Sequence, residues 1–199
     1  MDMTIEPNLL FGFYLSPGKK IEALEGLDLG FSYRGETVLD IYPFQTTGVT
    51  NAGSFPLNMT LALSDYYQPE MLTIGGAIST DTMTFSLDLE YQRWSGFRLS
   101  TPMRENFQGE LVDFDDILVP RIGFEFKAKK NLSLFMGYYY QPSFIPDKAV
   151  KGNMNFLDND KHVGSVGLSM KLPRLPLMKG DTELAMGYQL QYLVDRDVT

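Results

Sequence analysis

Residues 83–91 read Met-Thr-Phe-Ser-Leu-Asp-Leu-Glu-Tyr, and this stretch decides the fold class. Its odd-numbered residues are all apolar, and its even-numbered residues are all polar or charged. In a β-strand, successive side chains point to opposite faces, so this stretch would have one apolar and one polar face. In a helix, residues three and four positions apart would share a face, and the two kinds would mix. We therefore predict a strand.

The same alternation recurs along the chain, and no helical pattern of comparable length accompanies it. It predicts strands near residues 8–16, 26–42, 57–80, 83–97, 117–127, 131–141, 162–172 and 182–193. The segment 57–80 contains Pro69, which cannot donate to a ladder. We interpret this segment as one long strand with a kink at Pro69; the alternative is two strands joined by a turn at residues 66–70. The fold class is all-β and antiparallel.

The predicted connections alternate in length. Those near 17–25, 81–82, 128–130 and 173–181 are fairly short, and those near 43–56, 98–116 and 142–161 are long. Short turns on one rim and long loops on the other are typical of up-and-down transmembrane β-barrels. The strands are long enough to cross a bilayer when tilted, and aromatic residues gather near their ends. The alternative is a soluble antiparallel sandwich, whose apolar rows would face each other in a dry core.

Composition excludes several functions. A formal net charge of -8 over 199 residues argues against nucleic-acid binding, which needs a basic face. The absence of cysteine excludes disulfides, thiolate metal sites and a cysteine nucleophile. His162 is the single histidine, and no nucleophile accompanies it in the local sequence. We expect no enzyme, no catalytic residue and no cofactor.

Two acidic clusters are candidate calcium ligands, because calcium binds oxygen. They comprise Asp113, Asp115 and Asp116, and Asp158 and Asp160. Neither has the spacing of an EF-hand, so we interpret them as solvated loop charges and predict no metal. No run of about 18 apolar residues is present to form a membrane helix. Met1 is followed by Asp2 and Glu6 rather than by a basic region and an apolar run, so we expect the export signal to lie outside this sequence.

Several motifs follow one another in a familiar order. Residues 69–76 read Pro-Glu-Met-Leu-Thr-Ile-Gly-Gly and precede a short turn and a strand that ends in Trp94-Ser95. Residues 29–34 read Leu-Gly-Phe-Ser-Tyr-Arg, and residues 137–147 read Gly-Tyr-Tyr-Tyr-Gln-Pro-Ser-Phe-Ile-Pro-Asp. Together these motifs resemble the FadL-type outer-membrane transporters of long-chain fatty acids and other hydrophobic compounds.

The resemblance implies a fourteen-stranded barrel, of which residues 1–199 would form a single segment of about eight strands. The family's N-terminal hatch, first strands and last strand have no counterpart here, so the two sheet edges would pair with remaining barrel strands or another chain. The implied location is the bacterial outer membrane. The implied partners are hydrophobic small molecules and outer-membrane lipid or detergent.

The long loops hold apolar residues that a solvated loop does not need. The resemblance implies that they form a groove that captures substrate; alternatively, they pack the loops onto each other. These candidate capture residues are Tyr42, Phe44, Phe55, Phe107, Leu111, Phe114, Phe144 and Phe156.

The polar rows of the predicted strands would line the barrel lumen. Their candidate site residues are Arg34, Asp88, Glu90, Arg121 and Glu125. The cations either meet a substrate carboxylate by charge-assisted hydrogen bonds or pair with the acidic residues across the lumen. The first hypothesis for function is passive transport of hydrophobic small molecules, long-chain fatty acids or hydrocarbons. The alternatives are a general porin or structural barrel, and a soluble β-sandwich binding module.

Overall fold

The computed structural model describes five stretches with their side chains: residues 8–38, 67–97, 113–146, 158–172 and 182–196. It describes the strand residues 2–3, 39, 41–42, 45–52, 55–62 and 66 by their backbone. Three short 3-10 helices are η1 (Pro17–Lys19), η2 (Glu22–Leu24) and η3 (Trp94–Gly96). In this part of the chain, no helix has the length and apolar character needed to cross a membrane.

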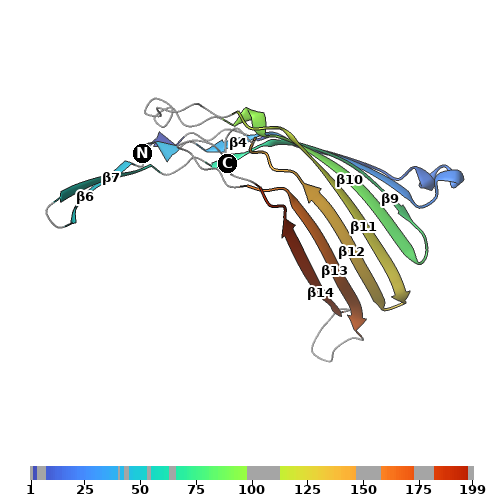
Figure 1. Ribbon diagram of the computed structural model, residues 1–199. Coiled ribbons are helices and arrows are strands. Elements are labelled where there is room, and N and C mark those ends of the chain that lie inside the picture. The colour runs from blue at the N-terminus through green and yellow to red at the C-terminus, as the bar shows by residue number, and fades with distance from the viewer. Residues whose placement is uncertain are drawn as a thin grey trace.

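Eight strands form one antiparallel sheet (Figure 1). Each of these strands pairs with the one that precedes it and the one that follows it along the chain among the eight. They are β2 (Leu10–Leu15), β3 (Leu27–Arg34), β9 (Glu70–Ser79), β10 (Met83–Arg93), β11 (Ile117–Lys129), β12 (Leu132–Gln141), β13 (Lys161–Leu172) and β14 (Thr182–Leu193). The spatial order runs from β14 to β9, then to β3 and β2. This confirms the predicted all-β, up-and-down topology. β2 and β14 are the two edges and do not pair with each other in the described ladder.

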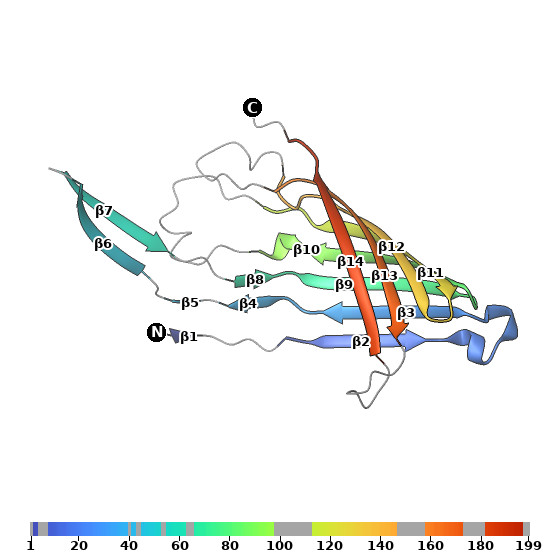
Figure 2. The same ribbon diagram turned by 90° about the horizontal axis from the view of Figure 1, so that it is seen from below.

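The short and long connections lie at opposite ends of the strands. Figure 2 shows η1 and η2 beyond one end of β2 and β3, and β4 (Thr37–Leu39) and β8 (Tyr66–Gln68) beyond the other. The second end, from which the connections 94–116 and 142–160 also start, is called the loop rim here. Short turns at one end and long loops at the other are the arrangement of outer-membrane barrels.

Pro69 interrupts the ladder without turning the chain. β4 pairs with β8, with Thr37 opposite Gln68, and β3 pairs with β9, with Arg34 opposite Met71. The register is the same on both sides of Pro69, so a turn at residues 66–70 is wrong. The missing N–H of proline breaks only the hydrogen bonding at this point. The expected single strand over 57–80 is nevertheless divided, because β7, β8 and β9 are separate.

A hairpin replaces part of the expected loop 43–56. β6 (Gln45–Ala52) pairs with β7 (Phe55–Ala62), and β1 (Asp2–Met3) pairs with β5 (Ile41–Tyr42). The physical reason is local: Thr46, Thr47, Val49 and Thr50 favour strands, and β7 alternates apolar and polar residues from Leu57 to Leu61. The predicted strand over 26–42 likewise breaks into β3, β4 and β5.

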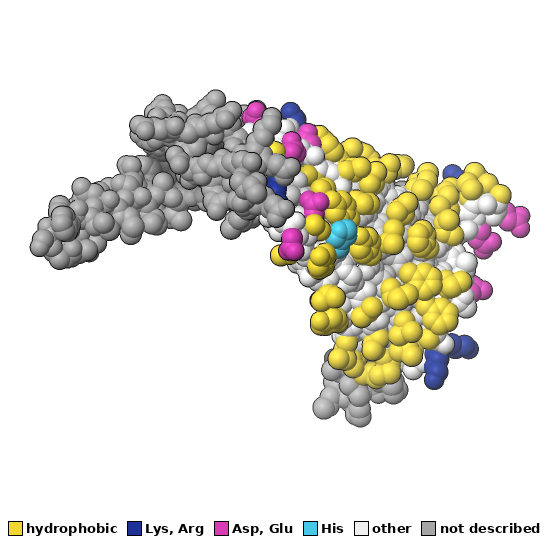
Figure 3. Space-filling view, in the orientation of Figure 1, with side chains coloured by type: hydrophobic (Ala, Val, Ile, Leu, Met, Phe, Trp, Pro, Cys, Tyr) yellow, Lys and Arg dark blue, Asp and Glu magenta, His cyan; other side chains and the backbone are white. Residues whose placement is uncertain are grey.

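The sheet is apolar on its outer face and polar on the other. Leu87 in the middle of β10 is 53% exposed and lies opposite Gly76 and Ile122, and Figure 3 shows hydrophobic side chains spread over this face. On the opposite face, here called the lumen face, Glu90 and Gln92 are buried. A soluble sheet buries its apolar face, so this arrangement suits a sheet whose outer face meets lipid.

Candidate functional site

The strand register places all five predicted polar residues on the lumen face. Asp88 lies opposite Arg121, and Glu125 lies opposite Thr84. Glu90 is two residues along β10 from Asp88, and Arg34 lies at the end of β3. Residues that oppose each other in an antiparallel ladder share a face, and so do residues two apart on one strand.

Glu90 and Arg121 form an ion pair on this face, toward the loop-rim ends of β10 and β11. Arg121 donates from both Nη atoms to the two carboxylate oxygens of Glu90, at 2.7 and 2.9 Å. The Glu90 side chain is 9% exposed, and the guanidinium carbon of Arg121 lies 5.8 Å from the ring centre of Tyr139. A bidentate pair of this kind fixes both side chains and satisfies most of their hydrogen-bonding groups.

A chain of hydrogen bonds runs from this ion pair to the loop rim. Gln92 Nε2 donates to Glu90 at 2.6 Å, and Trp94 Nε1 donates to Gln92 Oε1 at 2.9 Å. Gln92 and Glu90 are both on the lumen face of β10. Trp94 begins η3, where β10 has ended. These hydrogen bonds therefore connect a rim aromatic residue to the Glu90–Arg121 ion pair of the lumen wall.

Aromatic residues from three parts of the loop rim pack around Trp94. Trp94 stacks on Phe144 with ring centres 3.9 Å apart, and Phe114 meets Phe144 edge-on at 5.3 Å. Phe97 lies 5.0 Å from Phe114, and Tyr67 lies 5.3 Å from Phe97. We call Tyr67, Trp94, Phe97, Phe114, Phe144 and the neighbouring Ile145 the rim cluster. Phe114 and Ile145 are buried in it, so the cluster joins the connections between β10 and β11 and between β12 and β13.

A carboxylate anchors each of these two connections at the point where the chain re-enters the sheet. Directly before β13, Asp160 accepts the Tyr140 hydroxyl at 2.5 Å and the Ser143 N–H at 2.8 Å. Burial alone would raise the pKa of Asp160, but these hydrogen bonds outweigh it and hold the pKa below its usual value. The ionised form is therefore the one that the fold stabilises.

Asp116, directly before β11, has the same arrangement. It accepts the Tyr91 hydroxyl at 2.5 Å and the Ser95 N–H at 2.8 Å. Burial opposes ionisation here too, and the hydrogen bonds from Tyr91 and Ser95 again lower the pKa of Asp116. We call the two arrangements the Asp116 clasp and the Asp160 clasp. The sequence analysis interpreted Asp116 and Asp160 as solvated loop charges. That interpretation is wrong for these two residues, because each carboxylate accepts hydrogen bonds from a tyrosine hydroxyl and a serine N–H.

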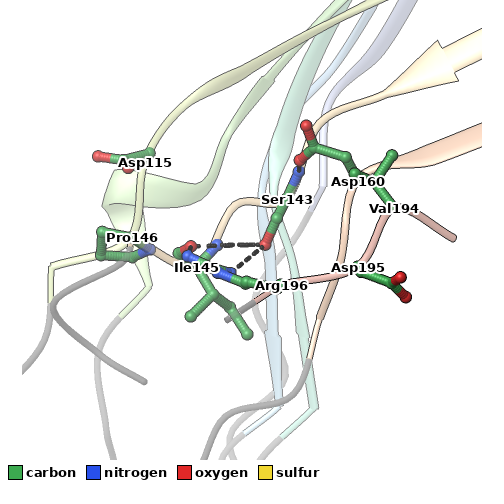
Figure 4. Close-up of a pocket in the computed structure, with 8 residues that line it drawn as sticks. All are labelled: Asp115, Ser143, Ile145, Pro146, Asp160, Val194, Asp195 and Arg196. Carbon is green, nitrogen blue, oxygen red and sulfur yellow. Dashed lines mark hydrogen bonds between the residues drawn. The ribbon is translucent and has the colours of Figure 1, made fainter. Parts of the chain in front are cut away.

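The segment after β14 also holds the β12–β13 connection, as Figure 4 shows. Arg196 donates to the Ser143 hydroxyl at 3.1 Å, to the Asp158 carbonyl at 3.0 Å and to the Ile145 carbonyl at 2.6 Å. A pocket of about 280 Å³ lies beside these contacts. Arg196 thus fixes the segment that carries Phe144 and Ile145 into the rim cluster.

The lumen face contains a second hollow, of about 270 Å³, where small residues line β3 and β9. Gly30 and Gly75 lie opposite each other, and Gly75 lies opposite Asp88. A Cβ added at Gly75 would lie 1.8 Å from Asp88 Oδ1, so the Asp88 side chain uses the space that this glycine leaves.

Of the predicted capture residues, Phe114 and Phe144 are described with side chains, and they lie together in the rim cluster. Phe44, Phe107, Leu111 and Phe156 lie outside the described residues, and Tyr42 and Phe55 are described by backbone alone. Pro69 is buried between β8 and β9.

Sequence reasoning did not identify Trp94 or Arg196 as site residues, and no sequence signal marks Arg196. Gln92 belongs to the polar row that the alternation predicts for the lumen face. His162 is the second residue of β13 and lies on the outer face, where its Nδ1 is 2.6 Å from the Tyr138 hydroxyl. Among the described residues, no three His, Asp or Glu side chains gather closely enough to hold a metal ion.

Comparisons with known proteins place this geometry in a family. The chain is 30% identical over 193 residues to alkane uptake protein A of Marinobacter nauticus, and the aligned region covers 88% of the chain and 40% of that protein. The fold matches the crystal structure of a Pseudomonas aeruginosa FadL homologue, with a TM-score of 0.60 and 13% identity, over 85% of this chain and 41% of that one. No protein-family profile matches the chain.

The chain therefore spans about 40% of the length of the relative that it matches. Over that length it is 30% identical to an alkane uptake protein, and its fold matches that of a FadL homologue. Its own sheet has the exposed apolar outer face described above. The chain belongs to the FadL-type family of outer-membrane β-barrels.

Proposed function

We propose that the chain forms part of the wall and outer mouth of a barrel that carries hydrophobic small molecules passively across the bacterial outer membrane. The candidate cargoes are hydrocarbons and long-chain fatty acids, and no bond changes during passage. The observation that carries the proposal is the distribution of side chains over the sheet, whose outer face has exposed apolar rows and whose lumen face is polar and hydrogen-bonded. The relative's name, alkane uptake protein A, supports a hydrophobic cargo.

The rim cluster supports a hydrophobic cargo. Phe114 and Phe144 belong to the predicted capture residues, and they stand at the loop rim directly above the Trp94–Gln92–Glu90 chain. Phe114 is buried and packs the loops together, whereas Trp94 and Phe144 are partly exposed. A hydrophobic molecule that reaches the loops would meet these two rings before it meets the polar lumen wall. The free edges of β2 and β14 would pair with further strands of the barrel, since an open sheet edge cannot lie in lipid.

Two measurements test the proposal. The purified protein should show β-structure by circular dichroism, and a heat-modifiable gel shift, in a neutral detergent but not in plain buffer. Liposomes that contain the folded protein should take up radiolabelled hexadecane or oleate faster than empty liposomes and should not swell in arabinose. A monomer that folds cooperatively in buffer would contradict the membrane assignment, and swelling in arabinose would favour a general porin.

A further inference from the structure

The apolar outer face ends against acidic residues at the loop rim and against lysines at the β11–β12 turn. The acidic residues at the loop rim include Asp116 and Asp160 of the two clasps. At the other end, β11 ends with Lys129, and the two-residue turn to β12 begins with Lys130. Figure 3 shows basic side chains at this edge of the hydrophobic face. We call Lys129 and Lys130 the lysine turn. Because the short turns of outer-membrane barrels lie on the periplasmic side, it belongs at the periplasmic leaflet.

A β-bulge places Lys129 on the outer face. Lys127 lies opposite Ser133, and Lys129 lies opposite Leu132, so Ala128 is the extra residue of β11 in this ladder. Ser133 belongs to the lumen face of β12, whereas Leu132 begins its apolar outer row. Residues two apart on a regular strand share a face, but one extra residue between them separates the faces. The bulge therefore leaves Lys127 on the lumen face and brings Lys129 to the face that meets lipid.

Neither residue of the lysine turn forms an ion pair within the part of the chain that the structure describes. Both lysines are exposed, and Asp81 in the neighbouring β9–β10 turn pairs with neither of them. Apolar residues border Lys129 on the outer face, because Leu132 opposite it pairs in turn with Met170 of β13. A lysine at such a boundary lays its methylene stem along the apolar surface and places its ammonium group among the lipid headgroups.

We infer that the lysine turn binds the headgroup phosphate of an anionic phospholipid in the periplasmic leaflet. Two adjacent ammonium groups can donate charge-assisted hydrogen bonds to one phosphate diester. The apolar residues beside Lys129 offer surface to acyl chains, which a free phosphate ion lacks. A zwitterionic headgroup carries its own cation, so the lysine turn prefers a lipid with a net negative charge. This contact is separate from the passage of cargo, and it anchors the wall in the membrane at the end opposite the loop rim.

The lipid that the folded protein retains tests this inference. The protein in neutral detergent is mixed with equal amounts of dioleoyl phosphatidylglycerol and dioleoyl phosphatidylcholine and passed over a gel-filtration column, and the retained lipid is extracted and quantified. The wild type should retain an excess of phosphatidylglycerol, whereas its net charge of -8 acting as a whole would disfavour that lipid. Lys129→Gln should lower the ratio of the two lipids about fivefold, the scale for one lysine at an anionic surface. Lys129→Arg should keep the ratio. Raising the ionic strength from about 0.1 to about 1 M should lower it, because the Debye length falls from about 10 to about 3 Å.

Lys127→Gln is the matched control, because it removes the same charge two residues away but on the lumen face, and it should keep the wild-type ratio. Lys130→Gln should lose phosphatidylglycerol as Lys129→Gln does, and a heat-modifiable gel shift shows that each variant is folded. Equal retention of the two lipids by the wild type, or an equal loss in Lys127→Gln and Lys129→Gln, would overturn the inference. So would folded Lys129→Gln and Lys130→Gln proteins that keep the wild-type ratio. If excess inorganic phosphate releases the phosphatidylglycerol, the lysine turn binds free phosphate and the assignment to lipid is wrong.

Discussion

Replacing Leu87 by lysine tests the orientation of the sheet, because the sign of the effect depends on what surrounds the outer face. Leu87 is 53% exposed near the middle of β10, and its ladder neighbours Gly76 and Ile122 provide no partner for a charge. On a water-exposed surface, such a change usually alters stability by no more than about 0.5 kcal/mol. At the midplane of a lipid-facing barrel strand, a lysine costs roughly 2–4 kcal/mol. We expect a loss of about 3 kcal/mol, roughly a hundredfold in the folding equilibrium.

The assay is urea unfolding of the protein in liposomes, followed by the fluorescence of Trp94. Two control variants separate depth from face. Met83→Lys places the charge on the same face at the end of β10, where the cost falls to about 0–1 kcal/mol. Ser86→Lys places it beside Leu87 on the lumen face and should also change stability by less than about 1 kcal/mol, since lumen substitutions meet water. A Leu87→Lys protein as stable as the wild type, or a Ser86→Lys protein equally destabilised, would refute the assignment of the two faces.

Two further predictions follow from the lumen face and the loop rim. Gly75→Val should destabilise the protein by about 1–3 kcal/mol because its Cβ would displace the Asp88 carboxylate, whereas Gly30→Ala, with nothing within 4 Å of its Cβ, should change little; equal losses in urea unfolding would contradict the argument. The pKa of Asp160 is lower in the folded than in the unfolded protein, so its contribution to stability is present above the unfolded pKa of about 3.9 and is lost as the pH falls through the folded pKa. Asp160→Asn should therefore reduce the loss of urea stability on acidification below about pH 5, and an unchanged acid profile would exclude the Asp160 clasp as its source.

The strands were predictable because alternation along one strand is a local signal. β14 begins and ends where the sequence places it, at Thr182 and Leu193, because large apolar residues alternate with polar or small ones from Glu183 to Tyr192. β10 was extended in the prediction to residue 97, whereas the strand ends at Arg93. There the chain turns into η3, which brings Trp94 onto Gln92. A contact of that kind leaves no trace in a period-two pattern.

The loop hairpin and the rim cluster were harder to predict, for different reasons. The hairpin of β6 and β7 had a local signal, but Gly48 and Pro56 interrupt its alternation and favour a loop interpretation. Phe114 and Phe144 are thirty positions apart, and their contact depends on the registers that place the ends of β11 and β12 side by side. The sequence predicted Phe114 and Phe144 as candidate capture residues because they are apolar residues in long loops. Only the arrangement of the sheet brings them into one cluster with Trp94.

The distribution of burial shows what must stabilise this wall. In the described part of the chain, the buried hydrophobic residues are Phe114, Ile117, Val119, Ile145 and Val163, all on the lumen side or at the loop rim. A core of five residues cannot offset the conformational entropy of ordering eight strands in water. The exposed apolar rows supply the missing stabilisation only if hydrocarbon covers them. The hydrogen-bonded ladder satisfies the backbone N–H and C=O groups there. The two Asp clasps complete the scheme, because they satisfy tyrosine hydroxyls and backbone N–H groups where the strands leave the hydrocarbon, and they anchor the loops of a chain that has no cysteine to cross-link them.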